Sequence, residues 1–298
     1  MPAQAYQRCP RCGNENRGDS YVCSFCGKRL KVEAIEKILF FKRIEAEWIN
    51  PAPWYLKILW LFISPNKAFW DINHRRNKAP GHLILLFNSF IYGLVGLALV
   101  SHFPSPYPNF AFFFNFTAFV LFFLLGLFFS YFFGTILIWL FIKGANYAVG
   151  FSEKLEARFG ATSQKETYKE AEMSPFSIYK GGTLSQTQSH KFKMMYCALS
   201  PFLVINLIDI LIILIAFPTT TIPFSINPDL FRTVFNNPAW MIINTLDALT
   251  IAIWVPILIT LAIRELSNSS TLRVLLASLS IGIIVAVLVF FIRPVFSS

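Results

Sequence analysis

The stretch Phe110 to Ile142, FAFFFNFTAFVLFFLLGLFFSYFFGTILIWLFI, contains no charged residue and decides the fold class. It is longer than the roughly 20 residues that a helix needs to cross the hydrocarbon core of a bilayer. Four further apolar runs are also long enough to cross, and they cover residues 83–103, 196–217, 240–263 and 274–292. The sequence therefore predicts an all-α integral membrane protein with five transmembrane helices, whose first partner is the lipid bilayer.

The composition supports this fold class. The chain is 55% hydrophobic and includes 33 phenylalanines among its 298 residues, which argues against two ordinary soluble domains. Of the 26 lysines and arginines, 24 lie before residue 83, between residues 143 and 193, or beside the gap between spans four and five, while only Arg232 and Arg293 lie on the other side. By the positive-inside rule, the N-terminus is cytoplasmic and the C-terminus is outside. The membrane is the cell membrane if the protein is prokaryotic.

The formal net charge of +10 also raises the question of nucleic-acid binding. The basic residues flank the spans and do not form one patch, so most of this charge is a topology signal and a nucleic-acid partner is not favoured. No cleavable signal peptide is visible, since the first 30 residues are polar and rich in cysteine. We therefore expect the N-terminal segment to be retained.

Two Cys-x2-Cys pairs in CPRCGNENRGDSYVCSFCG, residues 9–27, predict a zinc ribbon. Cys9, Cys12, Cys23 and Cys26 supply four thiolates, which suit the tetrahedral preference of Zn(II) in a closed structural site that holds one ion. A glycine follows each pair and allows a tight turn with positive φ. Two disulfides are the alternative, but the expected location is the reducing cytoplasm; iron or a redox pair also remains open.

This centre gives no reason to expect catalysis. Cysteine fills all four coordination positions, so none is left for water or substrate. The sequence also contains no HExxH, GxSxG or Gly-rich phosphate loop. The fifth cysteine, Cys197, lies at the inner end of span three and is interpreted as a packing residue. The sequence therefore predicts a protein that is not an enzyme.

The segment between ribbon and spans is predicted to hold amphipathic juxtamembrane helices. Apolar residues recur at helical spacing from Ile35 to Ile44, until Pro51 and Pro53 end the pattern. WYLKILWLFI, residues 54–63, is too short to cross and contains Lys57, so it is expected to lie on the membrane surface. The predicted domains are therefore a ribbon at 1–30, interfacial helices at 31–82 and a five-span domain at 83–298.

A family resemblance is carried by SPNKAFWDI at residues 64–72, by YCALSPFLVINL at 196–207, and by the region of Trp254 and Pro256. With the five-span layout, these stretches resemble the Yip domain family of Ypt- and Rab-interacting membrane proteins, and the ribbon resembles its prokaryotic members. The resemblance implies an all-helical membrane domain with a cytoplasmic N-terminus and, in eukaryotic members, a role in vesicle traffic. The chain lacks the family's aspartate-leucine-tyrosine-glycine-proline stretch, which leaves small-GTPase binding open.

Two function classes follow from these features. The first is a non-enzymatic membrane organiser or adaptor, in which the ribbon and the loop at about 144–193 recruit a cytoplasmic protein partner. The second is a transporter or an ion- or proton-conducting protein, in which polar residues inside the spans form a pathway. Acidic residues are sparse in the spans, so the organiser is preferred. The identity of the partner and homo-oligomer formation are left open by the sequence.

A repeated Asn-x2-Asp spacing occurs inside spans three and four. Asn206 and Asp209 lie in INLID, and Asn244 and Asp247 lie in INTLD. The aspartates are eight and seven residues from the outer ends of their spans, or about 12 and 10.5 Å in a helix. We therefore expect an intramembrane polar site in which the two carboxyl groups approach one another. Interhelical hydrogen bonding without a ligand, an ion or proton site, and side chains that face apart are all open.

Overall fold

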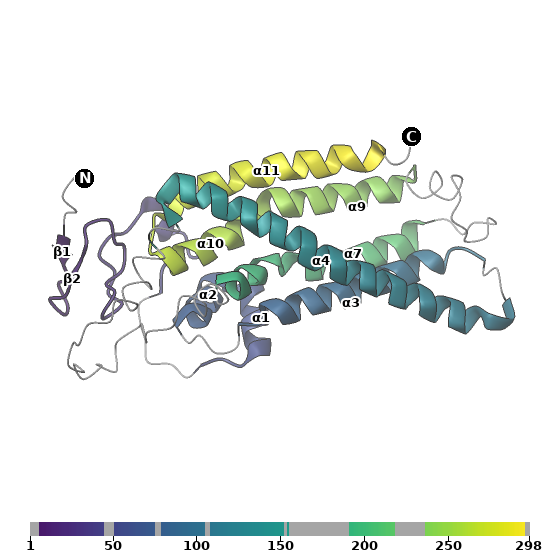
Figure 1. The fold of residues 1–298 in the computed structure, drawn as a ribbon, viewed down its shortest axis with the longest axis horizontal. Coiled ribbons are helices and arrows are strands. Elements are labelled where there is room, and N and C mark those ends of the chain that lie inside the picture. Colours follow the sequence, from purple (N-terminus) through teal and green to yellow (C-terminus); the bar gives the residue numbers. More distant parts are fainter. Residues whose placement is uncertain are drawn as a thin grey trace. The chain divides into compact units, whose positions relative to one another are not determined.

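The computed structural model describes residues 6–44, 51–74, 79–104, 108–151, 154, 191–217 and 236–295. Within these ranges it contains five helices that are long and apolar enough to cross a membrane, which confirms the predicted fold class. They can be followed by colour in Figure 1, from blue α3 to yellow α11. The predicted loop at 144–193 lies largely outside the described residues.

The first two spans are single helices. Helix α3 covers Gly81–Val100 and α4 covers Ala111–Val149. Helix α4 continues beyond the predicted end at residue 142 because Lys143 does not stop it; the helix ends where Gly150 takes φ 63° and its N–H donates to the carbonyl of Asn146. A 3₁₀ helix, η2, precedes α4 at Pro108–Phe110.

The last three spans contain two irregular turns, each of which ends two residues before a proline. Span three consists of residues 191–196, the 3₁₀ helix η4 at Cys197–Leu199, and α7 at Pro201–Ala216. Span four consists of α9 at Pro238–Leu249, the π-helix η5 at Thr250–Trp254, and α10 at Val255–Ser267. Helix α11, Thr271–Val295, is continuous. Pro201 and Pro256 account for these deviations, because proline lacks the N–H that a regular helix requires.

The chain divides into two compact units. Unit 1 contains Met1–Gly81, Leu140–Ala198 and Ile257–Ser278, and unit 2 contains His82–Trp139, Leu199–Pro256 and Leu279–Ser298. Unit 1 thus gathers the N-terminal segment, the connection between spans two and three, and the connection between spans four and five. These are the three segments in which the sequence concentrates lysine and arginine.

Unit 2 is held together by apolar contacts between its helices. One buried cluster joins α3, α7 and α9 and consists of Ala98, Leu99, Phe103, Ile213, Phe217, Ala239 and Ile243. Close approach of helix backbones adds to it: a Cβ on Gly96 of α3 would lie 2.1 Å from the ring of Phe122 in α4. A Cβ on Gly282 of α11 would lie 2.4 Å from Pro256 and 2.7 Å from the carbonyl oxygen of Ile251 in η5. Only glycine permits these contacts without displacement.

Unit 1 buries a lysine that the sequence places at the membrane surface. Helices α1, Trp54–Ile63, and α2, Pro65–His74, pack against each other. The Lys57 side chain is 0% exposed, and its Nζ lies 3.0 Å from Oδ2 of Asp71 in α2. The outward side of α1 instead carries Tyr55, Leu59 and Ile63. Lys57 thus has a buried anionic partner, while the placement of the 54–63 segment on the membrane surface stays a prediction.

The helix expected from Ile35 onward does not form. The chain makes a single 3₁₀ turn, η1, at Ala34–Lys37, and residues 38–44 follow as turns and extended chain. Residues 45–50 lie outside the described residues. The physical reason is an ion pair: Arg43 Nε lies 2.6 Å from Glu36 Oε1, and both side chains are almost fully buried. Burying and pairing these two charges overrides the helical spacing of the apolar residues.

The N-terminal module begins with a two-stranded antiparallel sheet. Strand β1, Tyr6–Arg8, pairs with β2, Glu15–Arg17, with Gln7 opposite Asn16. The first Cys-x2-Cys pair lies in the turn between the strands, and the second follows β2. A short bridge between Val22 and Arg29 encloses the second pair.

Candidate metal centre

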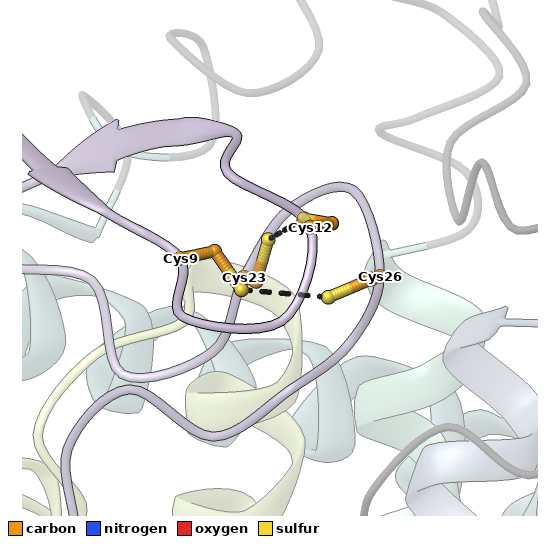
Figure 2. Close-up of side chains that lie close together, drawn as sticks. All are labelled: Cys9, Cys12, Cys23 and Cys26. Atoms are coloured by element: carbon orange, nitrogen blue, oxygen red, sulfur yellow. Dashed lines mark hydrogen bonds between the residues drawn. The ribbon is translucent and has the colours of Figure 1, made fainter.

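The four predicted cysteines converge. Their Sγ atoms all lie within 4.8 Å of one another, with Cys9 and Cys26 at 3.5 Å and Cys12 and Cys23 at 3.7 Å. Figure 2 shows the two pairs of sulfurs facing each other across the loops that carry them. Four sulfurs bound to one ion at about 2.3 Å would be about 3.8 Å apart, whereas a disulfide requires about 2.05 Å. The arrangement can therefore hold a metal ion, and all five cysteines are free thiols.

The two turns that present the cysteines have the same backbone form. Gly13 and Gly27 adopt φ values of 73° and 69°. The N–H of Gly13 donates to the carbonyl of Cys9 at 2.9 Å, and the N–H of Gly27 donates to that of Cys23 at 3.1 Å. The expectation that glycine follows each pair to allow a left-handed turn is confirmed. A residue with a Cβ would be strained at either position.

A buried asparagine joins the two turns, and sequence reasoning missed it. Asn16 is 4% exposed. Its Nδ2 donates to the carbonyl of Asn14 at 2.9 Å and lies 3.5 Å from Cys23 Sγ, while its Oδ1 accepts from the N–H of Ser24 at 2.9 Å. These bonds fix the second cysteine pair relative to the first and direct a donor at a ligand sulfur. No motif marks Asn16, because an asparagine in a polar segment is usually exposed.

The thiols differ in acidity. Burial raises the pKa of Cys9, but N–H donors from Cys12 and Arg11 outweigh burial and lower it to about 7. Burial, together with contacts to the other cysteine sulfurs, raises the pKa of Cys26 to about 12. A thiolate therefore forms more easily at Cys9 than at Cys26, and a bound cation would have to displace the proton of Cys26.

The ribbon is bound to the rest of unit 1 by specific polar contacts. The side-chain amide of Asn268, which follows α10, accepts from the N–H of Val22 at 2.9 Å and donates to the carbonyl of Val22 at 2.7 Å. Asp19 forms an ion pair with Lys154 at 2.8 Å. Burial raises the pKa of Asp19, but Lys154 and Arg17 outweigh it and lower the pKa. The ribbon thus has a fixed position within unit 1.

The segment after the ribbon contacts the same loop between α10 and α11. Glu33 Oε2 accepts from the N–H of Leu272 at 3.0 Å, and Glu36 Oε1 accepts from the hydroxyl of Thr271 at 2.9 Å. The guanidinium of Arg43 donates to the carbonyl of Ser269 and reaches the Thr271 hydroxyl at 3.4 Å. Two carboxylates therefore approach the first turn of α11, where the helix dipole favours negative charge.

The tips of the two cysteine turns remain accessible. Arg11 and Phe25 each stand between the cysteines of one pair, and both are exposed, as are Tyr6 and Arg8 in β1. We call Tyr6, Arg8, Arg11 and Phe25 the ribbon surface. It combines positive charge with two aromatic rings, a composition common in protein contact surfaces.

The intramembrane polar residues lie on α7 and α9, which pack against each other. Asp209 is 4% exposed, whereas Asn206, Asn244 and Asp247 are half-buried. Asp209 is one helical turn before Ile213, and Asp247 is one turn after Ile243; Ile213 and Ile243 belong to one buried cluster. Each aspartate therefore lies on the face of its own helix that contacts the other helix, one turn from the buried cluster. Because α7 and α9 run in opposite directions, both aspartates lie on the same side of that cluster. The approach of their carboxyl groups to one another stays a prediction.

Cys197 does not join the metal centre. It is fully buried in unit 1, and its thiol donates to the carbonyl of Lys193 at 3.3 Å. Its interpretation as a packing residue agrees with this burial. Comparison with known proteins gives no further guide to the centre, since no family model, curated protein or solved structure matches the chain.

Proposed function

We propose that this protein is a non-enzymatic, multi-pass membrane organiser or adaptor, which recruits a cytoplasmic protein partner through its ribbon. The observation that carries the proposal is the fixed position of the ribbon. Asn268 bonds to Val22, Lys154 pairs with Asp19, and Arg43 lies over the Tyr21 ring, while the ribbon surface stays exposed. A recruiting surface that is held rigidly loses little conformational entropy when a partner binds.

The metal we propose is one structural Zn²⁺ at Cys9, Cys12, Cys23 and Cys26. Four sulfur ligands, with distances of 3.5 and 3.7 Å across the two close pairs, suit this ion. Its role would be to stabilise a module of about 30 residues, which cannot bury enough apolar area to fold by itself. Because sulfur fills every position, the ion would not activate water.

The proposed topology places the N-terminus in the cytoplasm and the C-terminus outside, in the cell membrane if the protein is prokaryotic. The gathering of three basic segments in one unit supports this placement, since the positive-inside rule assigns them to one side. The Yip-like layout predicts the same orientation and is consistent with a role in membrane organisation or traffic. An exposed, positively charged ribbon surface favours a partner with an acidic surface.

The test is crosslinking in native membranes, followed by identification of the crosslinked proteins. An Arg11→Glu, Phe25→Ser variant should lose a specific partner, because it reverses the charge and removes an aromatic ring on the ribbon surface. Its zinc content should equal that of the wild type. The matched control is Leu39→Ser, which changes a side chain that is 80% exposed but lies outside the ribbon.

Retention of the partner by the control and its loss in the ribbon variant would support recruitment. The proposal fails if the ribbon variant, with its zinc still bound, crosslinks to the same proteins as the wild type.

A second candidate function is transport of an ion or proton through the site of Asp209 and Asp247. Two observations favour it. Both aspartates lie on the faces through which α7 and α9 contact each other. Asp247 also lies three residues before the π-helix Thr250–Trp254. Such π-helical turns are frequent at functional sites. Purified protein in vesicles should then dissipate a proton or cation gradient, and replacement of both aspartates with asparagine should abolish this activity while the fold is retained.

A further inference from the structure

The loop between α10 and α11 contains a residue in an unfavourable backbone conformation. Asn268 has φ 53°, and among the described residues it is the one residue other than glycine with positive φ. Its N–H donates to the carbonyl of Arg264 at 2.8 Å, so it ends α10 with a left-handed cap. Asparagine tolerates this conformation better than most residues with a Cβ, and contacts with its surroundings stabilise it further. Here, the holding contacts come from the ribbon.

Asn268 is paired with the backbone beside a metal ligand. Its amide makes one bond to the N–H and one to the carbonyl of Val22, the residue directly before Cys23. The N–H of Cys23 in turn donates to the carbonyl of Lys28 at 2.9 Å, and Val22 forms a bridge with Arg29. The position of both Val22 groups therefore depends on the turn that presents Cys23 and Cys26.

A second set of contacts ties the same loop to the ribbon through Arg43. The Arg43 guanidinium lies 5.0 Å from the ring centre of Tyr21, a ribbon residue adjacent to Val22. The same guanidinium pairs with Glu36 and donates to the carbonyl of Ser269. Tyr21 and Val22 thus reach the loop side by side, one through Arg43 and the other directly.

From these contacts we infer that metal binding stabilises residues 268–272, which are the loop between α10 and α11 and the start of α11; we call this coupling the latch. When the ribbon binds its metal, Val22 and Tyr21 have fixed positions, and their contacts fix the turn that joins spans four and five. The ribbon cannot maintain its turns on apolar burial alone, so loss of the metal removes the partners of Asn268. The left-handed cap then loses its support. This internal coupling goes beyond partner recruitment and is independent of whether a partner exists.

The experiment is hydrogen exchange measured by mass spectrometry on the full chain in lipid nanodiscs. It compares protein loaded with one equivalent of Zn²⁺ with the same protein after chelation, and zinc content is measured for each sample. Peptides that cover 264–273 should exchange about tenfold faster in the stripped protein, because two neutral hydrogen bonds to the loop are lost. Peptides from α3 should exchange at an unchanged rate.

The informative variant is Asn268→Gly. Glycine keeps the left-handed backbone but removes both amide contacts to Val22. With zinc bound, residues 264–273 of this variant should exchange faster than in the zinc-bound wild type, and chelation should accelerate them less than it does in the wild type. The remaining response is the part that Tyr21 and Arg43 transmit. The matched control is Asn237→Gly, which removes a side-chain hydrogen bond to the N–H of Ala239 at the start of α9. This control should keep the full zinc response at 264–273.

Four results would overturn the latch. In the first, chelation accelerates exchange in the ribbon but not at 264–273. In the second, zinc-bound Asn268→Gly stays as slow as the wild type. In the third, chelation accelerates all peptides equally, including α3. In the fourth, the purified protein binds no zinc. Loss of the crosslinked partner has no bearing on these outcomes, so the latch and the proposed recruitment are tested separately.

Discussion

Replacement of Lys57 with methionine tests whether the buried ion pair positions α1 on α2. The Lys57 Nζ and the Asp71 carboxylate are 3.0 Å apart, and their side chains are 0% and 6% exposed. At an effective dielectric constant of about 20, unit charges at this distance attract by about 5.5 kcal/mol. Desolvation of both groups opposes this attraction, so the pair itself is worth much less than that figure.

Breaking the pair from one side is nevertheless costly. Lys57→Met leaves the Asp71 carboxylate buried without its cation, which should lower the free energy of unfolding by about 3–5 kcal/mol. With about 2–4 °C for each kcal/mol, the midpoint of thermal unfolding should fall by roughly 6–20 °C. The double variant Lys57→Met, Asp71→Leu removes both charges and fills the space with apolar groups, so it should lie within about 1 kcal/mol of the wild type.

The assay is thermal unfolding of the purified protein in one detergent, followed by circular dichroism for the wild type, both single variants and the double variant. The double variant should be more stable than Lys57→Met. If Lys57→Met is as stable as the wild type, or if the double variant is less stable than Lys57→Met, the reasoning about this pair is refuted. An exposed ion pair would give little change in any of the three variants.

Three further predictions concern other parts of the molecule. Elemental analysis should find about one zinc ion per chain, and Cys23→Ser should reduce this content while the helical circular dichroism signal persists. Burial raises the pKa of Glu33, but contacts with Ser270 and the N–H of Leu272 outweigh burial and lower this pKa. The ionised Glu33 carboxylate therefore stabilises the fold above the ordinary carboxyl pKa, and this stabilisation is lost as the pH falls through the lowered pKa. Protection of the first turn of α11 against hydrogen exchange, measured relative to the intrinsic exchange rate at each pH, should therefore fall in acid in the wild type, and this part of the response should be missing in Glu33→Gln. Gly282→Leu should lower the thermal midpoint because its side chain would meet Pro256 and η5, whereas Leu288→Ala, at an exposed position of the same helix, should change it little.

The spans could be predicted from the sequence because bilayer thickness imposes one simple requirement, a long apolar helix. The predicted second span ends at residue 142, whereas α4 reaches Val149. Hydropathy marks where the apolar run stops, while the helix stops where Gly150 permits a left-handed cap. The cysteine cluster was equally predictable, since four thiols at this spacing have few other uses.

The connecting segment was not predictable by the same means. The apolar spacing from Ile35 to Ile44 indicates a helix, but Glu36 and Arg43 turn inward to meet each other and the loop before α11. Their partners, Ser269 and Thr271, are more than 200 residues away in the sequence, so no local pattern reveals them. Asn16 and Asn268 were missed for a related reason, because a single asparagine that bonds to backbone groups leaves no periodic signal.

Buried pairs also change the meaning of the charge asymmetry. Lys57, Arg43 and Arg264 count toward the basic excess, yet each is buried in unit 1 with an acidic residue nearby. Such cations are neutralised inside the protein and contribute little to attraction toward anionic lipids or acidic partners. Attraction must come instead from exposed residues such as Arg11 on the ribbon surface, since the exposed Arg8 pairs with Glu15 at 3.2 Å. Lys37, Lys42, Lys143 and Arg273 of unit 1 are exposed as well. Recruitment is assigned to the ribbon because its surface adds two exposed aromatic rings to the positive charge.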